Sequence, residues 1–325
     1  MKHITKYILI FLAILLIAWL VGFAGRSKQP SNVSSQETLR LGYLPIAECT
    51  PLFVAKNEKF FEKHGLNVEL SEFDSGPAVI AASLGGSLDG GLSGVTPIFF
   101  AVDKNKPIKM VNDGGHVIPA GHPYLGIVVE HTSPIRTLAD LKGKTVAVNG
   151  LKTIEDALLR VALNKAGIAN SVDVVALPHP NMVPALKNGT IDASMAIEPY
   201  IATGLSNGQI RVLVGSEELI PSFQISAIFF TNDFLNKKPE IIEKFTAAYN
   251  EAIDFINVNP ARAKEIVADW TKTPLETAKS MTLPGWSKEL NIAAVKEAQK
   301  VMLENKILER AVDLDSYFYK FGDNR

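Results

Sequence analysis

The stretch KGKTVAVNGLKTIEDA, residues 142–157, predicts a strand, a loop and a helix in immediate succession. Thr145 to Asn149 is a short apolar run rich in β-branched residues, typical of a parallel strand that is covered on both faces. Gly150 to Thr153 forms the loop, and a helix opens near Ile154. A strand that leads directly into a helix is the repeating unit of an α/β sheet, so this stretch indicates the fold class.

The same junction is a candidate ligand site. Free backbone N–H groups and the positive end of the helix dipole meet there, which favours a small polar or anionic ligand. In open α/β sheets, crevices at the carboxyl ends of strands are the usual binding sites. Every doubly wound protein has several such turns, so the segment equally fits a βα unit without a ligand.

The composition limits the classes of protein to which this chain can belong. The chain has 325 residues, enough for two domains, with 47% hydrophobic and 21% charged residues. Its 33 basic and 34 acidic residues leave a formal net charge of −1, and no helix-turn-helix or zinc-finger pattern is present, so nucleic acid is not an expected partner. The single cysteine, Cys49, excludes an internal disulfide and favours a buried or loop residue over a nucleophile. The histidines lack paired ligand spacing, so neither a metal nor a cofactor is expected.

The N-terminus, residues 1–37, is predicted to lie outside the fold. Lys2 and Lys6 precede an uncharged apolar run from Tyr7 to about Gly25. Its length suits an uncleaved membrane anchor with the positive end inside. Gly22 and Ala24 equally suit a signal peptide cut after Ala24. Both alternatives place the rest of the chain outside the cytoplasmic membrane.

Strands alternate with helices up to Thr231, which predicts an α/β fold with largely parallel sheets. We expect two lobes, 38–126 with 228–325 and 127–227, joined by two crossover strands. Such lobes can close like a hinge over a ligand. Further local expectations are a helix over 51–64, Ser75 as a helix cap, a strand over 108–112 with a loop over 114–123, Asn181 as the cap of a helix over 182–187, and C-terminal helices over 287–305 and 313–320.

Several segments resemble the substrate-binding proteins for nitrate, sulfonate and taurine. They are LRLGYLPIAECTPLFVAKNEKFFEKHGLNVELSEFDSG, SLGGSLDGGLSGVTPIFFA, TLADLKGKTVAV and LKNGTIDASMAIEPY, in collinear order between about 39 and 290. Thiamine-precursor binding proteins and pyrimidine synthases are related to this group. The resemblance implies the type II periplasmic binding protein fold. It also implies an extracytoplasmic protein that delivers a small solute to an ABC permease and its ATPase.

The candidate ligand-binding residues follow from the loops at strand carboxyl ends, which should line the cleft. For Ser75, Gly76 and Thr96, ligand contact and plain helix capping are both open, and the same holds for Glu198. Tyr124 could stack on a planar ligand or pack in the core. In the loop after the strand over 145–149, members of this group often carry Gly-Ser or Ser-Thr as ligand donors. This chain has Lys152 and Thr153 in that loop. The full candidate set is Glu48, Thr50, Ser75, Gly76, Thr96, Tyr124, Lys152, Thr153, Asn181 and Glu198.

The charges of these loops bear on the ligand. Glu48 and Glu198 with no Arg favour a neutral or amine-bearing ligand over a bare oxyanion, because buried carboxylates penalise an anion. Lys152 could supply a counter-charge, so the choice stays open. An enzyme of the pyrimidine-synthase type is the alternative to a binding protein, and the hydrophobic N-terminus speaks against it.

Overall fold

The computed structural model describes residues 38–118, 123–220 and 223–322 of the 325-residue chain. The predicted signal peptide or membrane anchor at 1–37 lies outside these residues. Among the helices that are described, none has both the length and the apolar character needed to cross a membrane.

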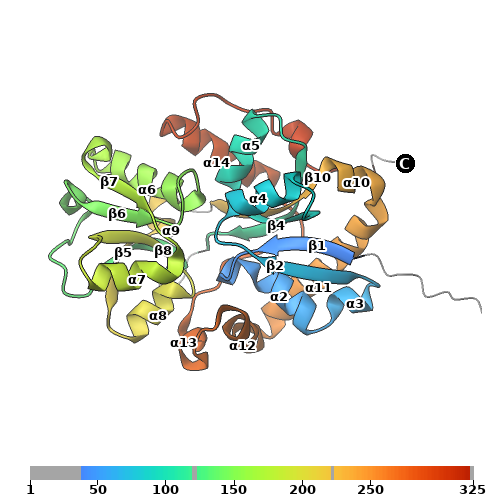
Figure 1. The fold of residues 1–325 in the computed structure, drawn as a ribbon, viewed down its shortest axis with the longest axis horizontal. Helices are drawn as coiled ribbons and strands as arrows, with labels where there is room; N and C mark the ends of the chain where they lie inside the picture. Colours follow the sequence, from blue (N-terminus) through green and yellow to red (C-terminus); the bar gives the residue numbers. More distant parts are fainter. Residues whose placement is uncertain (1–37, 119–122, 221–222, 323–325) are drawn as a thin grey trace, which may run out of the picture. The chain divides into compact units, whose positions relative to one another are not determined.

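Two five-stranded sheets form the framework of residues 38–325 (Figure 1). The first has the order β2-β1-β3-β10-β4 and the second the order β7-β6-β8-β5-β9. The strands of the first are β1 (Thr38–Tyr43), β2 (Asn67–Glu72), β3 (Gly90–Gly94), β4 (Ile108–His116) and β10 (Gln224–Thr231). Those of the second are β5 (Leu125–Glu130), β6 (Thr145–Val148), β7 (Asp173–Ala176), β8 (Ala193–Ile197) and β9 (Ile210–Gly215).

Both sheets are mixed in the same way. In each, four strands share one direction and the fifth is antiparallel: β10 pairs antiparallel with β3 and β4, and β5 pairs antiparallel with β8 and β9. These are the two strands that the chain enters after crossing from the other sheet. The expectation of largely parallel sheets is confirmed for eight of the ten strands, and the crossovers account for the other two.

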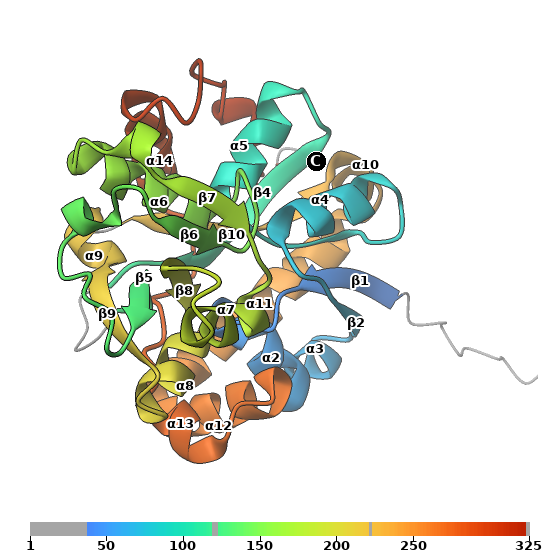
Figure 2. The ribbon, with the colours of Figure 1, turned by 60° about the vertical axis from the view of Figure 1, so that its left-hand side comes forward.

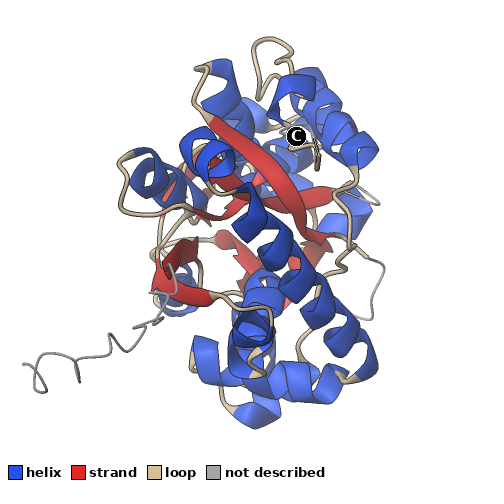
Figure 3. Cartoon of the chain, turned by 90° about the vertical axis from the view of Figure 1, so that its right-hand side faces the viewer, coloured by secondary structure: helices blue, strands red, loops and turns tan. Residues whose placement is uncertain are grey.

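Helices cover both faces of each sheet, as expected for α/β architecture (Figures 1 and 2). The first sheet carries α4 and α5 on one face and α2, α3 and α11 on the other. The second carries α6 on one face and α7 and α8 on the other. Their bounds are α2 (Thr50–Asn57), α3 (Phe60–Lys63), α4 (Gly76–Leu84), α5 (Val95–Asp103), α6 (Ile154–Lys165), α7 (His179–Lys187), α8 (Tyr200–Ser206), α9 (Ser216–Leu219) and α10 (Asn232–Lys237). The C-terminal helices are α11 (Pro239–Val258), α12 (Pro260–Thr271), α13 (Leu275–Ser280) and α14 (Ile292–Glu304). Figure 3 shows helices packed on either side of the strands.

Aromatic side chains fill the core between the first sheet and α11. Phe245 is fully buried and stacks on Phe61 and Tyr249, with ring centroids 5.8 and 5.6 Å apart. It also meets the edge of Phe230 from β10 at 5.3 Å. Offset and edge-to-face geometries of this kind add to the burial energy of the rings. The antiparallel strand β10 is therefore anchored in the first lobe, although the chain reaches it from the second.

A buried carboxylate holds the crossover region together. Asp113, near the end of β4, is fully buried, and its Oδ1 accepts hydrogen bonds from the backbone N–H of Gly115 and from the Gln224 side chain, both at 2.7 Å. Its Oδ2 accepts one from the Ser287 N–H at 2.9 Å and lies 2.9 Å from His116 Nδ1. One side chain thus joins β4, the start of β10 and the C-terminal segment at the point where the chain passes between the lobes.

Several local expectations are wrong, each for a physical reason. The helix expected over 51–64 breaks in two at Lys59, which has a left-handed φ of 60°. Strand β4 continues to His116 because Gly115 and His116 pair with β10 and His116 also pairs with Gly285, so the first part of the loop expected over 114–123 is strand. Helix α14 begins at 292 rather than 287, and 313–320 contains one 3-10 turn.

Candidate functional site

A small cavity lies between the two lobes, at the carboxyl ends of their parallel strands. Its volume is about 20 Å³, which is room for one water molecule. The first lobe contributes the loops after β1 and β3 and the start of α4, and the second contributes the loop after β6 and the start of α6. The lining residues are Leu44, Ile46, Glu48, Gly76, Leu92, Gly94, Pro97, Asn149, Thr153, Ile154 and Glu155.

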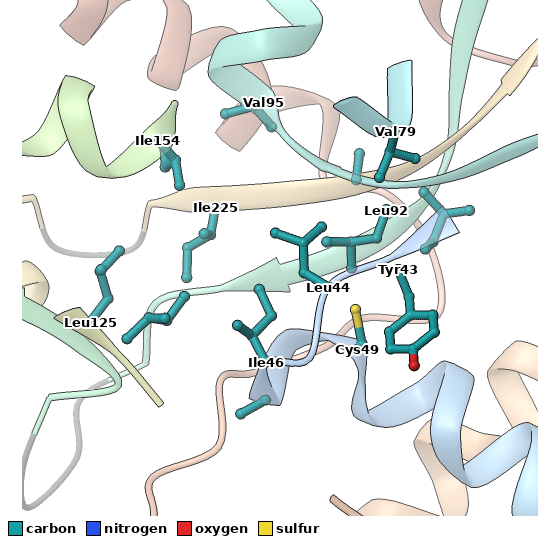
Figure 4. Packing of buried hydrophobic residues seen from close by; sticks show 14 of the residues in the cluster. Tyr43, Leu44, Ile46, Cys49, Val79, Leu92, Val95, Leu125, Ile154 and Ile225 are labelled. Carbon is teal, nitrogen blue, oxygen red and sulfur yellow. The ribbon is translucent and has the colours of Figure 1, made fainter. Parts of the chain in front are cut away.

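Apolar side chains from both lobes form the walls of this cavity. Figure 4 shows Leu44, Ile46 and Leu92 from the first lobe, with Ile154 on the α6 side. Leu44, Ile46 and Ile154 are each at most 5% exposed. Burial of these surfaces is worth roughly 25 cal/mol per Å². The space left between them is too small for anything larger than a water molecule.

Glu48 is the predicted residue whose environment is most unusual. It is 3% exposed and sits in the 3-10 turn that joins β1 to α2. Ser226 Oγ donates to its Oε1 at 3.3 Å. Burial, followed by the nearby charge of Glu155, raises the pKa of Glu48 to about 8. At neutral pH this carboxyl therefore holds a proton that it would lose in water.

A second carboxyl comes from the other lobe. Glu155, in the first turn of α6, is 3% exposed and lines the same cavity as Glu48. Its Oε1 lies 3.3 Å from Nε2 of His179, which is 5% exposed. The His179 ring in turn stacks on Tyr200, with centroids 5.4 Å apart. Two buried carboxyls therefore belong to one cavity, each presented by a different lobe.

Two further polar groups lie beside this pair. The hydroxyl of Tyr124, which is 4% exposed, interacts with Glu48, and Oδ1 of Asn149 has no hydrogen-bond partner among the described residues. Burial and the charge of Glu48 hold the pKa of Tyr124 well above its usual value, so the two side chains interact electrostatically. Buried polar groups are usually hydrogen-bonded, so Oδ1 of Asn149 is an acceptor that this cavity can offer to a ligand.

The remaining candidates divide by position. Gly76 and Thr153 line the cavity with Glu48, and Thr153 caps α6 by accepting from Asp156 N–H at 3.3 Å. Thr50 and Thr96 are fully buried and are not among the lining residues. The Thr50 hydroxyl donates to Ala47 O, and the Thr96 hydroxyl donates to Met302 Sδ. The latter pair therefore serves packing in this structure.

Three candidates lie elsewhere or act differently than expected. Ser75 occupies the cap position of α4 but makes no side-chain capping bond. Asn181 is inside α7, not its cap, because the helix begins at His179 with Pro180 in its first turn, where proline is favoured. Lys152 lines a separate groove of about 460 Å³, and its Nζ lies 5.2 Å from the centre of the Phe100 ring.

Glu198 is fully buried and caps backbone groups. Its Oε2 accepts from the Ala202 N–H at 2.9 Å, at the start of α8, and its Oε1 accepts from the Thr282 N–H at 3.1 Å. Its backbone carbonyl also accepts from Ala47 N–H at 3.1 Å. Of the two alternatives that the sequence leaves open for Glu198, helix capping is the one seen here, together with contacts that join both lobes to the C-terminal segment.

Replacing Glu198 by alanine is expected to lower the free energy of unfolding by about 2–3 kcal/mol. The change leaves the N–H groups of Ala202 and Thr282 without this acceptor, and a hydrogen bond to a charged group is worth roughly that much. Urea denaturation of the wild type and the variant measures the loss. Glu240→Ala, at an exposed position in the first turn of α11, is the control. A loss below about 1 kcal/mol would show that Glu198 does not hold these elements.

No pattern in the sequence marks Glu155 as a site residue. Acidic residues are common in the first turn of a helix, where they complement the dipole, so the Thr-Ile-Glu-Asp sequence carries no further signal. His179 lies in the segment 177–181, one of the strand-end loops, and its spacing to the other histidines gives no metal-binding pattern. Among the residues that the structure describes, no group of three or more His, Cys, Asp or Glu side chains is arranged to hold a metal ion.

Comparisons with known proteins identify the family of this chain and match its fold. A model of the NMT1-like family matches residues 33–271. A protein of Escherichia coli that is named for binding aliphatic sulfonates is 28% identical over 292 residues, covering 86% of this chain and 88% of that protein. The crystal structure of the periplasmic aliphatic sulphonate binding protein SsuA from the same organism matches with a TM-score of 0.71 and 24% identity, covering 87% of this chain and 92% of that one. The desulfurization enzyme DSZB matches with a TM-score of 0.62 and 14% identity over 87% and 96% of the chains.

Proposed function

Because the chain belongs to the NMT1-like family, we propose that it is the extracytoplasmic solute-binding component of an ABC importer. The lobes, 38–126 with 228–325 and 127–227, close over a small solute and present it to a permease and its ATPase. The strand order supports this division, because the chain passes from the first sheet to the second between β4 and β5 and returns between β9 and β10. The N-terminal segment would hold the protein at the membrane if it is not cleaved.

One observation carries this proposal: the cavity is lined by strand-end loops of both lobes and holds a buried carboxyl from each. A site divided between two lobes exists only when they are closed, so ligand binding and closure are coupled. Relatives named for binding aliphatic sulfonates and nitrate or nitrite support the role of a binding protein. Pyrimidine or thiamine precursors are a further solute class that the resemblance in the sequence implies.

A pyrimidine-synthase-like enzyme of the same fold is the alternative, and the fold neighbour DSZB is an enzyme. That alternative needs a reactive nucleophile or lysine in the cavity. The residues that line it include neither cysteine nor lysine. Cys49 is fully buried next to Glu48, and burial raises the pKa of its thiol, which makes it unreactive.

Closure is measurable by energy transfer between two dyes, one on each lobe. Glu69 on β2 and Asp173 on β7 are exposed, and the native Cys49 is fully buried, so Glu69→Cys with Asp173→Cys gives two selectively labelled sites. We expect a change in transfer efficiency on addition of a compound that raises the melting temperature. The panel comprises alkylsulfonates, nitrate, alkylamines and aminopyrimidines. A compound that raises the melting temperature without changing the transfer, or that is consumed, would contradict the proposal.

A further inference from the structure

A second and larger hollow lies on the first lobe, at the edge of its sheet. Its volume is about 650 Å³, within the range of about 300–1,000 Å³ that is usual for small-molecule sites. The edge strand β4 supplies one wall, helix α11 a second, and the segments 288–292 and 318–321 the rest. It shares no lining residue with the cavity between the lobes, so it is a separate candidate site.

Apolar and aromatic side chains make up most of the walls of this hollow. Three rings come from one short stretch near the C-terminus, Phe318, Tyr319 and Phe321, and the last two meet edge to face with centroids 5.0 Å apart. Phe321 is 50% exposed and Ile292, on another wall, is 44% exposed. Apolar surface that water still reaches gains free energy when a ligand covers it. The walls therefore favour a ligand with an aromatic body.

Amide side chains supply part of the polar lining. Asn112, on β4, is 1% exposed, and its Oδ1 accepts a hydrogen bond from the Thr246 hydroxyl at 3.2 Å. Asn250, one turn after Thr246 on α11, is half-buried, and its Oδ1 has no hydrogen-bond partner among the described residues. Buried polar groups are usually paired, so this oxygen is an acceptor for a donor that enters the hollow.

The charges around the hollow disfavour an anion. Lys288 Nζ is paired with Asp254 Oδ2 at 2.8 Å. The other charged lining residues are Glu243 and Glu289, whose side chains are exposed. The start of α14, at Ile292, adds about half a positive charge, which is less than the two carboxylates carry. Because these carboxylates stand in water and are screened by salt, a neutral donor on an apolar body suits the hollow best.

We infer that this hollow is a second small-molecule site, which binds a neutral aromatic compound carrying an N–H or O–H donor. The ring covers the exposed apolar surface of Phe321 and Ile292, and the donor bonds Oδ1 of Asn250. The site is independent of the cavity between the lobes, and the inference does not rest on the proposed function.

Indole and 1-methylindole test this inference on the full chain, because the two compounds differ only in methylation of the N–H donor. Binding is measured by ligand-observed NMR. We expect indole to bind with a dissociation constant of about a millimolar, the order expected for a ligand of nine heavy atoms. 1-Methylindole should bind at least about threefold more weakly, because it leaves the Asn250 acceptor unpaired. Indole-3-acetate, which adds a carboxylate, should also bind more weakly than indole.

Three variants locate the binding. Ala247→Trp should abolish it, because the new side chain fills the hollow from an exposed position on α11. Asn250→Leu keeps the size of the side chain but removes the acceptor, so it should reduce the affinity for indole to that for 1-methylindole. Ala81→Trp, at an exposed position on α4, is the control and should bind indole as the wild type does.

Several outcomes overturn the inference. They are the absence of indole binding at about 10 mM, and binding that survives Ala247→Trp. Equal affinities for the two indoles would mean that water satisfies Asn250, which also overturns it. Sedimentation velocity tests another occupant: wild-type dimers that Ala247→Trp dissociates would assign the hollow to a second copy of the chain. Each of these results leaves the importer proposal standing, since none involves the cavity between the lobes.

Discussion

Replacing Asp113 by alanine is expected to lower the free energy of unfolding by about 4–5 kcal/mol. Breaking a buried, hydrogen-bonded charge network costs this much because the remaining partners are left without an acceptor. Here the groups left behind are the N–H groups of Gly115 and Ser287 and the amide of Gln224. Urea denaturation at neutral pH measures the change.

Asp254→Ala is the control for this variant. Asp254 pairs with Lys288 at 2.8 Å, yet both side chains are more than half exposed, and such surface pairs are worth less than about 1 kcal/mol. A loss at Asp113 no larger than at Asp254 would contradict the role of this network. Because Asp113 lies where the chain passes between the lobes, its loss should also broaden the distribution of lobe separations in the dye-labelled protein.

The parts of this structure that the sequence predicts are the elements specified by local sequence patterns. The expected strand over 145–149 and helix from Ile154 correspond to β6 and α6 within one residue. A β-branched run followed by a glycine loop and an amphipathic segment specifies both elements without help from distant residues. The alternation of such units, continued to Thr231, was enough for the fold class.

The network around Asp113 could not be predicted because its partners are far apart in sequence. Gln224 is 111 residues from Asp113, and Ser287 is 174 residues away. The local sequence Asn-Asp-Gly-Gly-His reads as a turn, since these residue types favour turns. Only tertiary pairing with β10 and Gly285 makes this stretch extended and buries the carboxylate.

The site was predictable in outline and not in detail. Loops at strand carboxyl ends do meet in the cavity, and Glu48, Gly76 and Thr153 were among the candidates. Glu48 and Glu155 come close together only through the way the two lobes pack. The spacing of residues within either lobe does not predict that packing. Glu198 was indistinguishable from a ligand contact in sequence, because a capping carboxylate and a binding carboxylate look the same there.

Replacing Glu48 by glutamine is expected to remove a large pH dependence of stability. The pKa of Glu48 is about 8 in the folded protein, against an ordinary value of 4.5. A folded-state pKa above the unfolded one means that the folded chain binds more protons between these values. The stabilisation is therefore complete below about pH 4.5 and is lost as pH rises through about 8.

The size of the effect follows from the same two values. A difference from 4.5 to about 8, at about 1.4 kcal/mol per pH unit, sets an upper bound of ~5 kcal/mol. Separation of the lobes lets water reach the ionised carboxylate and reduces the loss, so we expect about 2–5 kcal/mol between pH 5 and pH 9 for the wild type. Glutamine, which does not ionise, should flatten this slope and make the variant more stable than the wild type at pH 9.

Denaturation curves at several pH values between about 5 and 9 measure this difference. The control is Glu251→Gln. Its partners Lys63 and His64 hold the pKa of Glu251 below the ordinary value. The stability that Glu251 contributes is therefore lost as the pH falls, not as it rises. Parallel slopes for wild type and Glu48→Gln would mean that Glu48 is hydrated in solution and that the lobes stand open without ligand. A flattened slope would show instead that the Glu48 carboxyl is buried in the folded protein before any solute arrives.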